Sequence, residues 1–158
     1  MTRSEFLRQA IAAAKAASAK SGFPAGITVA QAALESAWGQ SKLSREANNY
    51  FGIKAYGNHD RIAMPTHEFE NGMAKAVTAE FARFQSMAEC FAARDRLIAT
   101  SNAFAEARAC PADAEAFARA IAKHWATDPA YPEKILAIHG RFKLNSLDGS
   151  AVLASASA

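Results

Sequence analysis

Residues 27–41 read ITVAQAALESAWGQS, and this stretch decides how the chain is expected to fold. Thr28 and Gln31 have the spacing of a capping box, in which the threonine hydroxyl accepts a hydrogen bond from the third helical amide and the glutamine side chain bonds the threonine amide. The pattern predicts a helix that begins at Val29 and is ended by Gly39.

Glu35 is a candidate acid because apolar residues flank it and Trp38 follows one helical turn later. A carboxyl group desolvated against an aromatic ring has a raised pKa, so it can hold a proton near neutral pH and act as a general acid. A helix must also expose one face, so the same pattern fits Glu35 as an ordinary surface residue. Periodicity alone leaves both interpretations open.

The composition favours helices. Alanine accounts for 40 of the 158 residues, within a hydrophobic fraction of 51%. Alanine is the strongest helix former and is depleted in strands, which argues against a β-sandwich or barrel, and the lack of sustained heptads argues against a coiled coil. The chain is therefore expected to be a compact, mostly helical globule.

The basic charge favours anionic partners, which include nucleic acid, membrane surfaces and bacterial cell-wall polymers, and charge alone does not choose among them. The net charge of +3 is mild, and the Lys and Arg residues form no stripe of the kind that nucleic-acid binders carry. The sequence has no run of 18 apolar residues, so stable membrane insertion is not expected. We expect no nucleic-acid partner and a monomeric protein.

Further helices are expected on both sides of this segment. A single domain is predicted over residues 1–144, with a flexible tail over 145–158 that is rich in Ser and Ala. Ser41 is expected to cap a short helix, Ser86 and Glu89 form a second capping box, and Pro111 precedes another helix. The predicted helices cover residues 4–20, 41–47, 86 onward, 103–109, 112–124 and 132–142.

Residues 48–72 differ from the rest of the chain. They contain two alanines, three of the eight glycines and four aromatic residues. The sequence predicts a small, irregular β-hairpin lobe here, with a turn at Asn71 and Gly72. Glu68, Glu70 and Asp60 would lie in this lobe. Glycoside hydrolysis commonly uses two carboxylates, and a helix end that faces such a lobe could supply them.

Four motifs in order resemble the glucosaminidase family of peptidoglycan hydrolases, which includes flagellar rod-cap, autolysin and phage endolysin domains. They are ITVAQAALESAWGQS at 27–41, NNYFGIK at 48–54, THEFENG at 66–72 and ATDP at 126–129, followed by Tyr131 and Lys134. The resemblance spans residues 26–138. It implies a lysozyme-like α+β fold, mainly helical, with a glycan groove between a helical body and a small β-hairpin lobe.

The resemblance also implies roles for particular residues. The family's catalytic acid falls on Glu35, and its second acid, a base or stabiliser, falls on Glu68, with Glu70 as the alternative. Asn49 and Phe51 lie in the segment that lines the groove, although both are also compatible with a structural role in the lobe. Two further substrate contacts fall on the ATDP motif and the residue before it.

Among these groove positions, Trp125 and Thr127 are expected to bind substrate. The family usually carries tyrosine at the position of Trp125. Tryptophan keeps an aromatic face for stacking and lacks the hydroxyl. Asp128, which precedes Pro129, is expected to shape a turn or cap the last helix. Trp38 is expected to pack rather than to form a sugar platform.

The function implied is hydrolysis of β-1,4 bonds in the GlcNAc–MurNAc backbone of peptidoglycan, as an endo-β-N-acetylglucosaminidase. Alternatives are an N-acetylmuramidase or a lytic transglycosylase on the same fold, and a non-catalytic glycan-binding module. No cofactor is expected. No metal is expected either, since the four histidines lack zincin spacing.

The N-terminal segment resembles no signal peptide. The protein is expected to be made in the cytoplasm and to reach the cell wall by phage-type release or dedicated secretion. Cys90 and Cys110 lack metal-type spacing and are expected to be free thiols, with a disulfide as the alternative.

Overall fold

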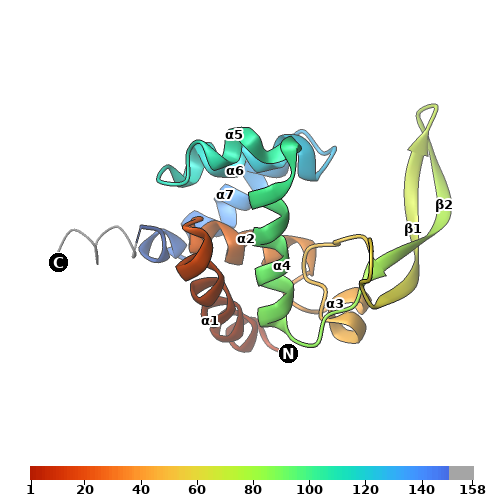
Figure 1. Cartoon of the computed structure of the whole chain (residues 1–158), viewed down its shortest axis with the longest axis horizontal. Helices are drawn as coiled ribbons and strands as arrows, with labels where there is room; N and C mark the ends of the chain where they lie inside the picture. Colours follow the sequence, from red (N-terminus) through yellow and green to blue (C-terminus); the bar gives the residue numbers. More distant parts are fainter. Residues whose placement is uncertain (150–158) are drawn as a thin grey trace.

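The computed structural model describes residues 1–149 as a helical body from which one β-hairpin projects (Figure 1). The hairpin extends from the side of the body opposite residues 144–149, the last that the structure describes. The elements in order are α1 (Arg3–Ser21), α2 (Ala25–Glu35), α3 (Lys42–Ala47), β1 (Arg61–Glu70), β2 (Met73–Ala82), α4 (Met87–Thr100), the 3-10 turn η1 (Asn102–Phe104), α5 (Ala105–Arg108), α6 (Ala114–Trp125), α7 (Tyr131–Arg141) and the 3-10 turn η2 (Leu144–Leu147).

Helix α2 lies inside the helical body, where it packs against α1, α7 and η2. Its residues 25–33 are all buried. Four of these nine are alanine, whose single methyl group allows neighbouring helices to approach closely. Because the buried helix ends at Glu35, that carboxyl group stands at the edge of the core rather than on an open surface.

The N-terminus of α2 lies one turn earlier than the capping box predicts. The helix begins at Ala25 after Pro24, and Thr28 is a buried residue inside it. The Thr28 hydroxyl donates to the Pro24 carbonyl (3.2 Å) and accepts from Arg94 (2.9 Å). The expectation that Thr28 and Gln31 form a capping box is therefore wrong, because both side chains bond residues distant in the sequence.

The C-terminus of α2 also differs from the prediction. The helix ends at Glu35, and Ala37 and Trp38 adopt left-handed backbone conformations with φ of 49° and 59°. The Ser36 hydroxyl accepts a hydrogen bond from the Gly39 amide (2.9 Å) and stabilises this turn. Trp38 packs against Phe6 and Phe142 with centroid distances of 5.8 and 4.9 Å, so it contributes packing, as expected.

The other helices largely match their predicted ranges. Ser41 caps α3 and Ser86 caps α4, each by accepting a hydrogen bond from an amide of the first turn. The segment 103–109 is divided into η1 and α5. Helix α6 begins at Ala114 instead of residue 112, because Asp113 accepts a hydrogen bond from the Ala116 amide and is the actual N-cap.

The hairpin has the predicted turn, but its second strand lies entirely beyond the predicted lobe of residues 48–72. Asn71 and Gly72 join β1 and β2 with φ of 53° and 76°, and the antiparallel register pairs Glu70 with Met73. Strand β2 lies beyond the alanine-poor segment and itself contains four alanines, so composition gave no indication of it. The 51–54 segment contributes a single bridge, between Lys54 and Phe81.

The start of the predicted C-terminal tail is part of the folded body. Leu144 is buried, and Asp148 accepts a hydrogen bond from the Gly26 amide (2.7 Å) and contacts His139 Nε2 (2.6 Å). The amides of the first turn of a helix have no partner within it, and they favour a nearby carboxylate. The tail prediction is therefore wrong for residues 145–148, and residues 150–158 lie outside the described residues.

A Gly26→Ala substitution is expected to destabilise the protein by about 1–3 kcal/mol, the usual range for overpacking. A Cβ atom at Gly26 would overlap the Leu144 carbonyl oxygen and lie 2.9 Å from Asp148 Oδ1. Thermal or chemical denaturation measures the change. Gly140→Ala is the matched control, because a Cβ atom there meets nothing within 4 Å. Equal stability of the two variants would contradict the close packing of η2 on α2.

Both cysteines are free, as expected. Cys90 is buried, which raises its pKa to about 12, and Cys110 is half-buried. Within residues 1–149, no helix is both long and apolar enough to cross a membrane.

Candidate active site

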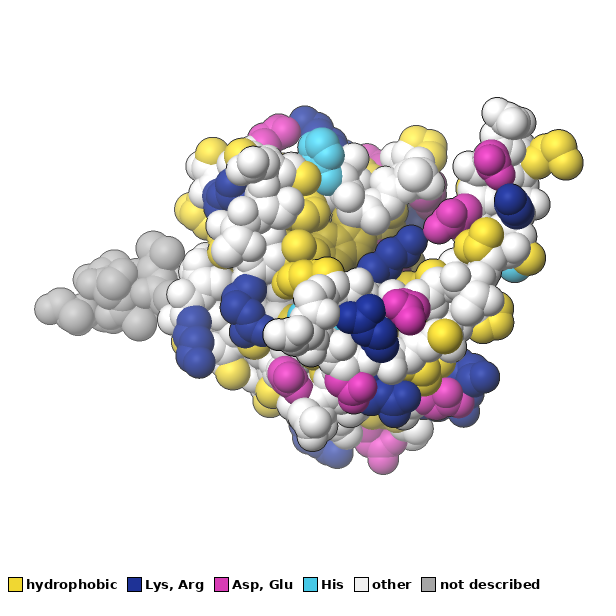
Figure 2. Space-filling view, turned by 45° about the vertical axis from the view of Figure 1, so that its right-hand side comes forward, with side chains coloured by type: hydrophobic (Ala, Val, Ile, Leu, Met, Phe, Trp, Pro, Cys, Tyr) yellow, Lys and Arg dark blue, Asp and Glu magenta, His cyan; other side chains and the backbone are white. Residues whose placement is uncertain are grey.

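A groove of about 730 Å³ runs between the helical body and the hairpin. Figure 2 shows this hollow, with hydrophobic side chains at its floor. Four segments far apart in the sequence line it: the end of α2, the loop after α3, strand β1 with Phe81 of β2, and the end of α6 with the following turn. The lining residues are Glu35, Phe51, Gly52, Lys54, Thr66, His67, Glu68, Phe81 and residues 123–128.

Glu35 occupies the helical side of this groove and is half-buried. Its Oε1 accepts a hydrogen bond of 2.5 Å from the Tyr131 hydroxyl. Burial raises the pKa of Glu35, and the hydrogen bond from Tyr131 opposes part of that rise. The side chain therefore meets the requirement for a general acid, which is a carboxyl group that remains protonated at higher pH than an exposed one.

Tyr131 is a further candidate for the site, although the motif that contains it gives no indication that it contacts Glu35. It is the first residue of α7 and is buried, and its hydroxyl also accepts a hydrogen bond from Gln31 Nε2 (3.2 Å). Burial and, after it, the adjacent carboxyl of Glu35 raise the pKa of Tyr131 above its ordinary value, so the phenol keeps its proton at neutral pH. Another tyrosine, six residues after Trp125, thus places a hydroxyl against Glu35 from the buried side.

Glu68 lies on the opposite, hairpin side of the groove. It is exposed and forms an ion pair with Lys54 (3.3 Å). Glu70 lies two residues further along β1 and therefore on the same face. It pairs instead with Lys75 (3.4 Å) and does not line the groove. Of the two candidate second acids, only Glu68 shares the groove with Glu35.

Phe51 and Trp125 line the groove and also pack against other aromatic rings of the helical body. Trp125 is half-buried, and its Nε1 donates to the Phe51 carbonyl (3.3 Å). The Phe51 ring is 1% exposed and packs on Phe91 and Trp125, so it supports the floor and offers no open face for a sugar. Thr127 is exposed beside Trp125 in the groove lining.

Asn49 is not part of the groove, which corrects its predicted role in binding substrate. Its side chain is 1% exposed. The Nδ2 atom donates to the carbonyls of Ile53 (2.8 Å) and Ala82 (2.9 Å), and Oδ1 accepts from the Ile53 amide (3.1 Å). With its hydrogen-bonding capacity used in this way, Asn49 joins the loop after α3 to the base of β2.

Asp128 shapes the turn before α7, as expected. Its carboxylate accepts from the Ala130 amide (2.9 Å) and pairs with Lys134 (2.6 Å). These contacts lower the pKa of Asp128, with the Lys134 bond as the larger cause. The turn places Tyr131 at the start of α7, directed at Glu35.

Within residues 1–149, no group of three or more His, Cys, Asp or Glu side chains could hold a metal ion.

This chain resembles one family model and several known proteins over most of its length. The glucosaminidase family model, described as mannosyl-glycoprotein endo-beta-N-acetylglucosaminidase, matches residues 11–144. The peptidoglycan hydrolase FlgJ of Escherichia coli K12 is 39% identical over 137 residues, which cover 82% of this chain and 44% of FlgJ. The exo-glucosaminidase LytG of Bacillus subtilis is 33% identical over 127 residues, which cover 77% of this chain and 45% of LytG. The chain thus spans less than half the length of these curated relatives.

Solved structures show the same fold. A glycoside hydrolase domain of Salmonella typhimurium FlgJ is 35% identical with a TM-score of 0.73, covering 90% of this chain and 98% of that domain. The catalytic domain of the Listeria monocytogenes autolysin Auto has a TM-score of 0.82 at 23% identity, covering 92% of this chain and 87% of that domain. The lysozyme-like α+β fold is confirmed, and the chain belongs to the glucosaminidase family.

Proposed function

We propose that this protein hydrolyses β-1,4 glycosidic bonds in the GlcNAc–MurNAc backbone of peptidoglycan, most directly as an endo-β-N-acetylglucosaminidase. The observation that carries the proposal is the half-buried Glu35, bonded to Tyr131 at the side of an open groove. Relatives named as peptidoglycan hydrolases support the choice of polymer. Since this polymer lies outside the cytoplasmic membrane, the protein would act there.

In this proposal Glu35 protonates the oxygen of the leaving sugar. Burial favours the neutral carboxyl before the proton is transferred. The Tyr131 hydroxyl bonds Oε1, so the proton that reaches the substrate is carried by the other oxygen. After transfer, the same hydroxyl stabilises the carboxylate that is left. Burial thus favours the acid form and Tyr131 limits the rise in pKa, as a catalytic acid near neutral pH requires.

Glu68 would complete the pair from the hairpin side, by assisting a water molecule or by stabilising positive charge on the sugar ring. We expect Glu68→Gln to lower turnover about a hundredfold, within the range for one general acid or base. Release of reducing ends from purified peptidoglycan measures the rate. Glu70→Gln is the matched control on the same strand face, and a larger loss in this variant would reassign the second acid.

Product analysis tests the bond that is cleaved. Mass spectrometry of fragments from purified peptidoglycan should show reducing GlcNAc. Reducing MurNAc would favour the muramidase alternative, which the probable N-acetylmuramidase of Lactococcus lactis (30% identical over 153 residues) makes the strongest competitor. Anhydro-MurNAc would indicate a lytic transglycosylase. Binding to the wall without any fragment released would contradict an enzymatic function.

A further inference from the structure

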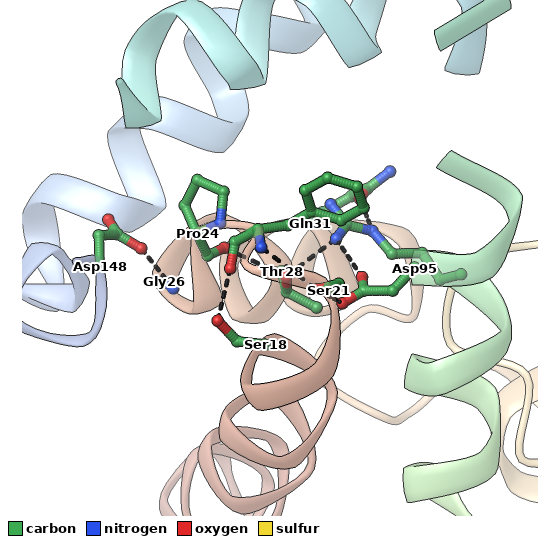
Figure 3. A network of polar contacts seen from close by, with 10 residues as sticks. Ser18, Ser21, Pro24, Gly26, Thr28, Gln31, Asp95 and Asp148 are labelled. Atoms are coloured by element: carbon green, nitrogen blue, oxygen red, sulfur yellow. Dashed lines mark hydrogen bonds and ion pairs between the residues drawn. The ribbon is translucent and has the colours of Figure 1, made fainter. Parts of the chain in front are cut away.

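A buried set of polar contacts connects α4 to the side chain of Glu35. Arg94 of α4 is completely buried and forms an ion pair of 2.7 Å with its neighbour Asp95. The guanidinium group also donates to Gln31 and Thr28, both on α2. Figure 3 shows Thr28, Gln31 and Asp95 where α1, α2 and α4 meet. Arginine and aspartate are rarely fully buried, so an ion pair here calls for a physical explanation.

These contacts form a series of hydrogen bonds that begins at Arg94 and ends at Glu35, and the chemistry of the donors fixes the direction of each bond. A guanidinium group can only donate, so the atom of Gln31 that lies 3.0 Å from Arg94 Nε must be the amide oxygen. The Gln31 nitrogen is then directed to the Tyr131 oxygen, at 3.2 Å. Because that oxygen accepts from Gln31, the proton of Tyr131 is available for Glu35 Oε1, at 2.5 Å.

Arg94 itself is held from several sides. Asp95 balances its charge and in turn accepts a hydrogen bond from Ser21 of α1 (2.7 Å). The guanidinium lies near the rings of Phe51 and Phe117, at 5.7 and 5.8 Å from their centroids. These restraints leave the group little freedom to rotate, so the orientation of the Gln31 amide is set by the body of the protein.

We propose that Arg94 and Gln31 are positioning residues, which fix the direction of the Tyr131 hydroxyl so that it donates to Glu35. This inference rests on the proposed function of Glu35 as the catalytic acid. Neither residue touches the groove, and both act through Tyr131. The buried ion pair then affects the site as well as stability, because the charged donor Arg94 selects one of the two orientations of the Gln31 amide.

Loss of the Gln31 donor has a defined consequence. The Tyr131 hydroxyl becomes free to turn away from Glu35, and the carboxylate loses a hydrogen bond that favours it. The pKa of Glu35 then rises further. A general acid must be protonated to work, so activity falls as pH increases through this pKa. The alkaline limb of the pH–rate profile therefore moves to higher pH, while turnover falls because the carboxyl is less well oriented.

Other titratable groups near Glu35 remain unchanged in this experiment. Tyr131 of α7 and, through Gln31, Arg94 of α4 face it from the body. The groups that share the groove with it are Lys54, His67 and Glu68 on the hairpin side, and Lys123, His124 and Asp128 at the end of α6 and the following turn. Gln31→Met adds no charge and alters none of the groups in the groove, so a shift of the alkaline limb in that variant reports on Glu35.

Gln31→Glu is the first test variant, because it keeps an acceptor for Arg94 and removes the donor to Tyr131. Gln31→Met removes both. We expect each variant to move the alkaline limb of kcat upward by about 0.5–1 pH unit and to lower kcat about tenfold, with KM changed less than about twofold. Ile27→Val, a fully buried change on the same helix outside the network, is the control and should leave the limb in place.

A double-substitution cycle separates positioning from general loosening of the structure. In a Tyr131→Phe background the hydroxyl is gone, so Gln31→Glu should cause no further upward shift of the limb beyond the direct effect of the added charge, and Gln31→Met none at all. The inference would be overturned if Gln31→Met shifted the alkaline limb as much in the Tyr131→Phe background as in the wild type. It would also be overturned if neither Gln31→Glu nor Gln31→Met alone moved the limb.

Titration of the Glu35 carboxyl by carbon NMR, in the protein without substrate, tests the inference independently of turnover. The pKa of Glu35 should be higher in Gln31→Met than in the wild type. If the pKa moves but Glu35 is dispensable for hydrolysis, the proposed function fails and the positioning role remains. If Glu35 is essential and its pKa does not move, the positioning role fails alone.

Discussion

Replacing Glu35 with glutamine is expected to reduce hydrolysis of purified peptidoglycan about a thousandfold, within the range for loss of a general acid. Glutamine keeps the shape of the side chain and can still accept the hydrogen bond from Tyr131, but it has no proton of suitable acidity to transfer. The release of reducing ends measures the rate. Glu46→Gln, at an exposed site on α3 outside the groove, is the matched control. Wall clearance at the original rate by Glu35→Gln would remove the basis of the proposed mechanism.

The same substitution is expected to increase stability at neutral and alkaline pH. The pKa of Glu35 is raised in the folded protein, so the folded state binds the proton more tightly than the unfolded state does. Stability therefore falls as pH increases from the unfolded to the folded pKa, and the deficit persists above that window. Glutamine removes this penalty. Thermal unfolding of the wild type and of Glu35→Gln across this pH range should show a difference in stability that grows as pH increases.

Replacing Asp95 with asparagine is expected to lower the free energy of unfolding by about 3–5 kcal/mol, the usual cost of leaving a buried charge without its partner. Arg94 is 0% exposed and loses the carboxylate at 2.7 Å that balances it. Chemical denaturation measures the loss. The control is Glu115→Gln, which breaks an ion pair with Arg119 on the surface and should change stability very little.

A second variant shows whether the loss reflects the unpaired charge. In Arg94→Met with Asp95→Leu both charges are gone, and buried ion pairs replaced by apolar residues are often tolerated. The double variant should therefore be more stable than Asp95→Asn alone, although it still loses the hydrogen bonds to Thr28 and Gln31. A double variant less stable than the single one would show that these hydrogen bonds outweigh the charge.

Local patterns predicted much of the fold. Side chains at Ser41 and Ser86 cap helices because their bonds are made within one turn, and Asn71 with Gly72 adopts the backbone that a hairpin turn needs. Glu35 was identified because its helix is apolar and its motif resembles the family. Each of these features depends on residues that are close together in the chain.

The remaining features depend on residues far apart in the chain. Tyr131 bonds a carboxyl 96 residues away, and Asp148 bonds an amide 122 residues away. No residue near Thr28 in the sequence indicates that its hydroxyl accepts a hydrogen bond from Arg94 instead of capping the helix. Asn49 lies in a motif associated with the groove, yet its amide bonds the backbone of Ile53 in the same loop and of Ala82 at the end of β2. Such partners are set by tertiary packing, which sequence spacing does not encode.

The two sides of the groove differ in how firmly they are held. Glu35 ends a helix enclosed by the core, whereas Glu68 lies on a hairpin whose strands bond chiefly each other and expose most of their side chains. Segments with few buried apolar contacts open locally at a lower free energy than the whole protein unfolds. We therefore expect the distance between the two carboxylates to vary as the two-stranded sheet opens and closes locally. A stiff polymer strand bound across both sides of the groove would narrow the range of that distance.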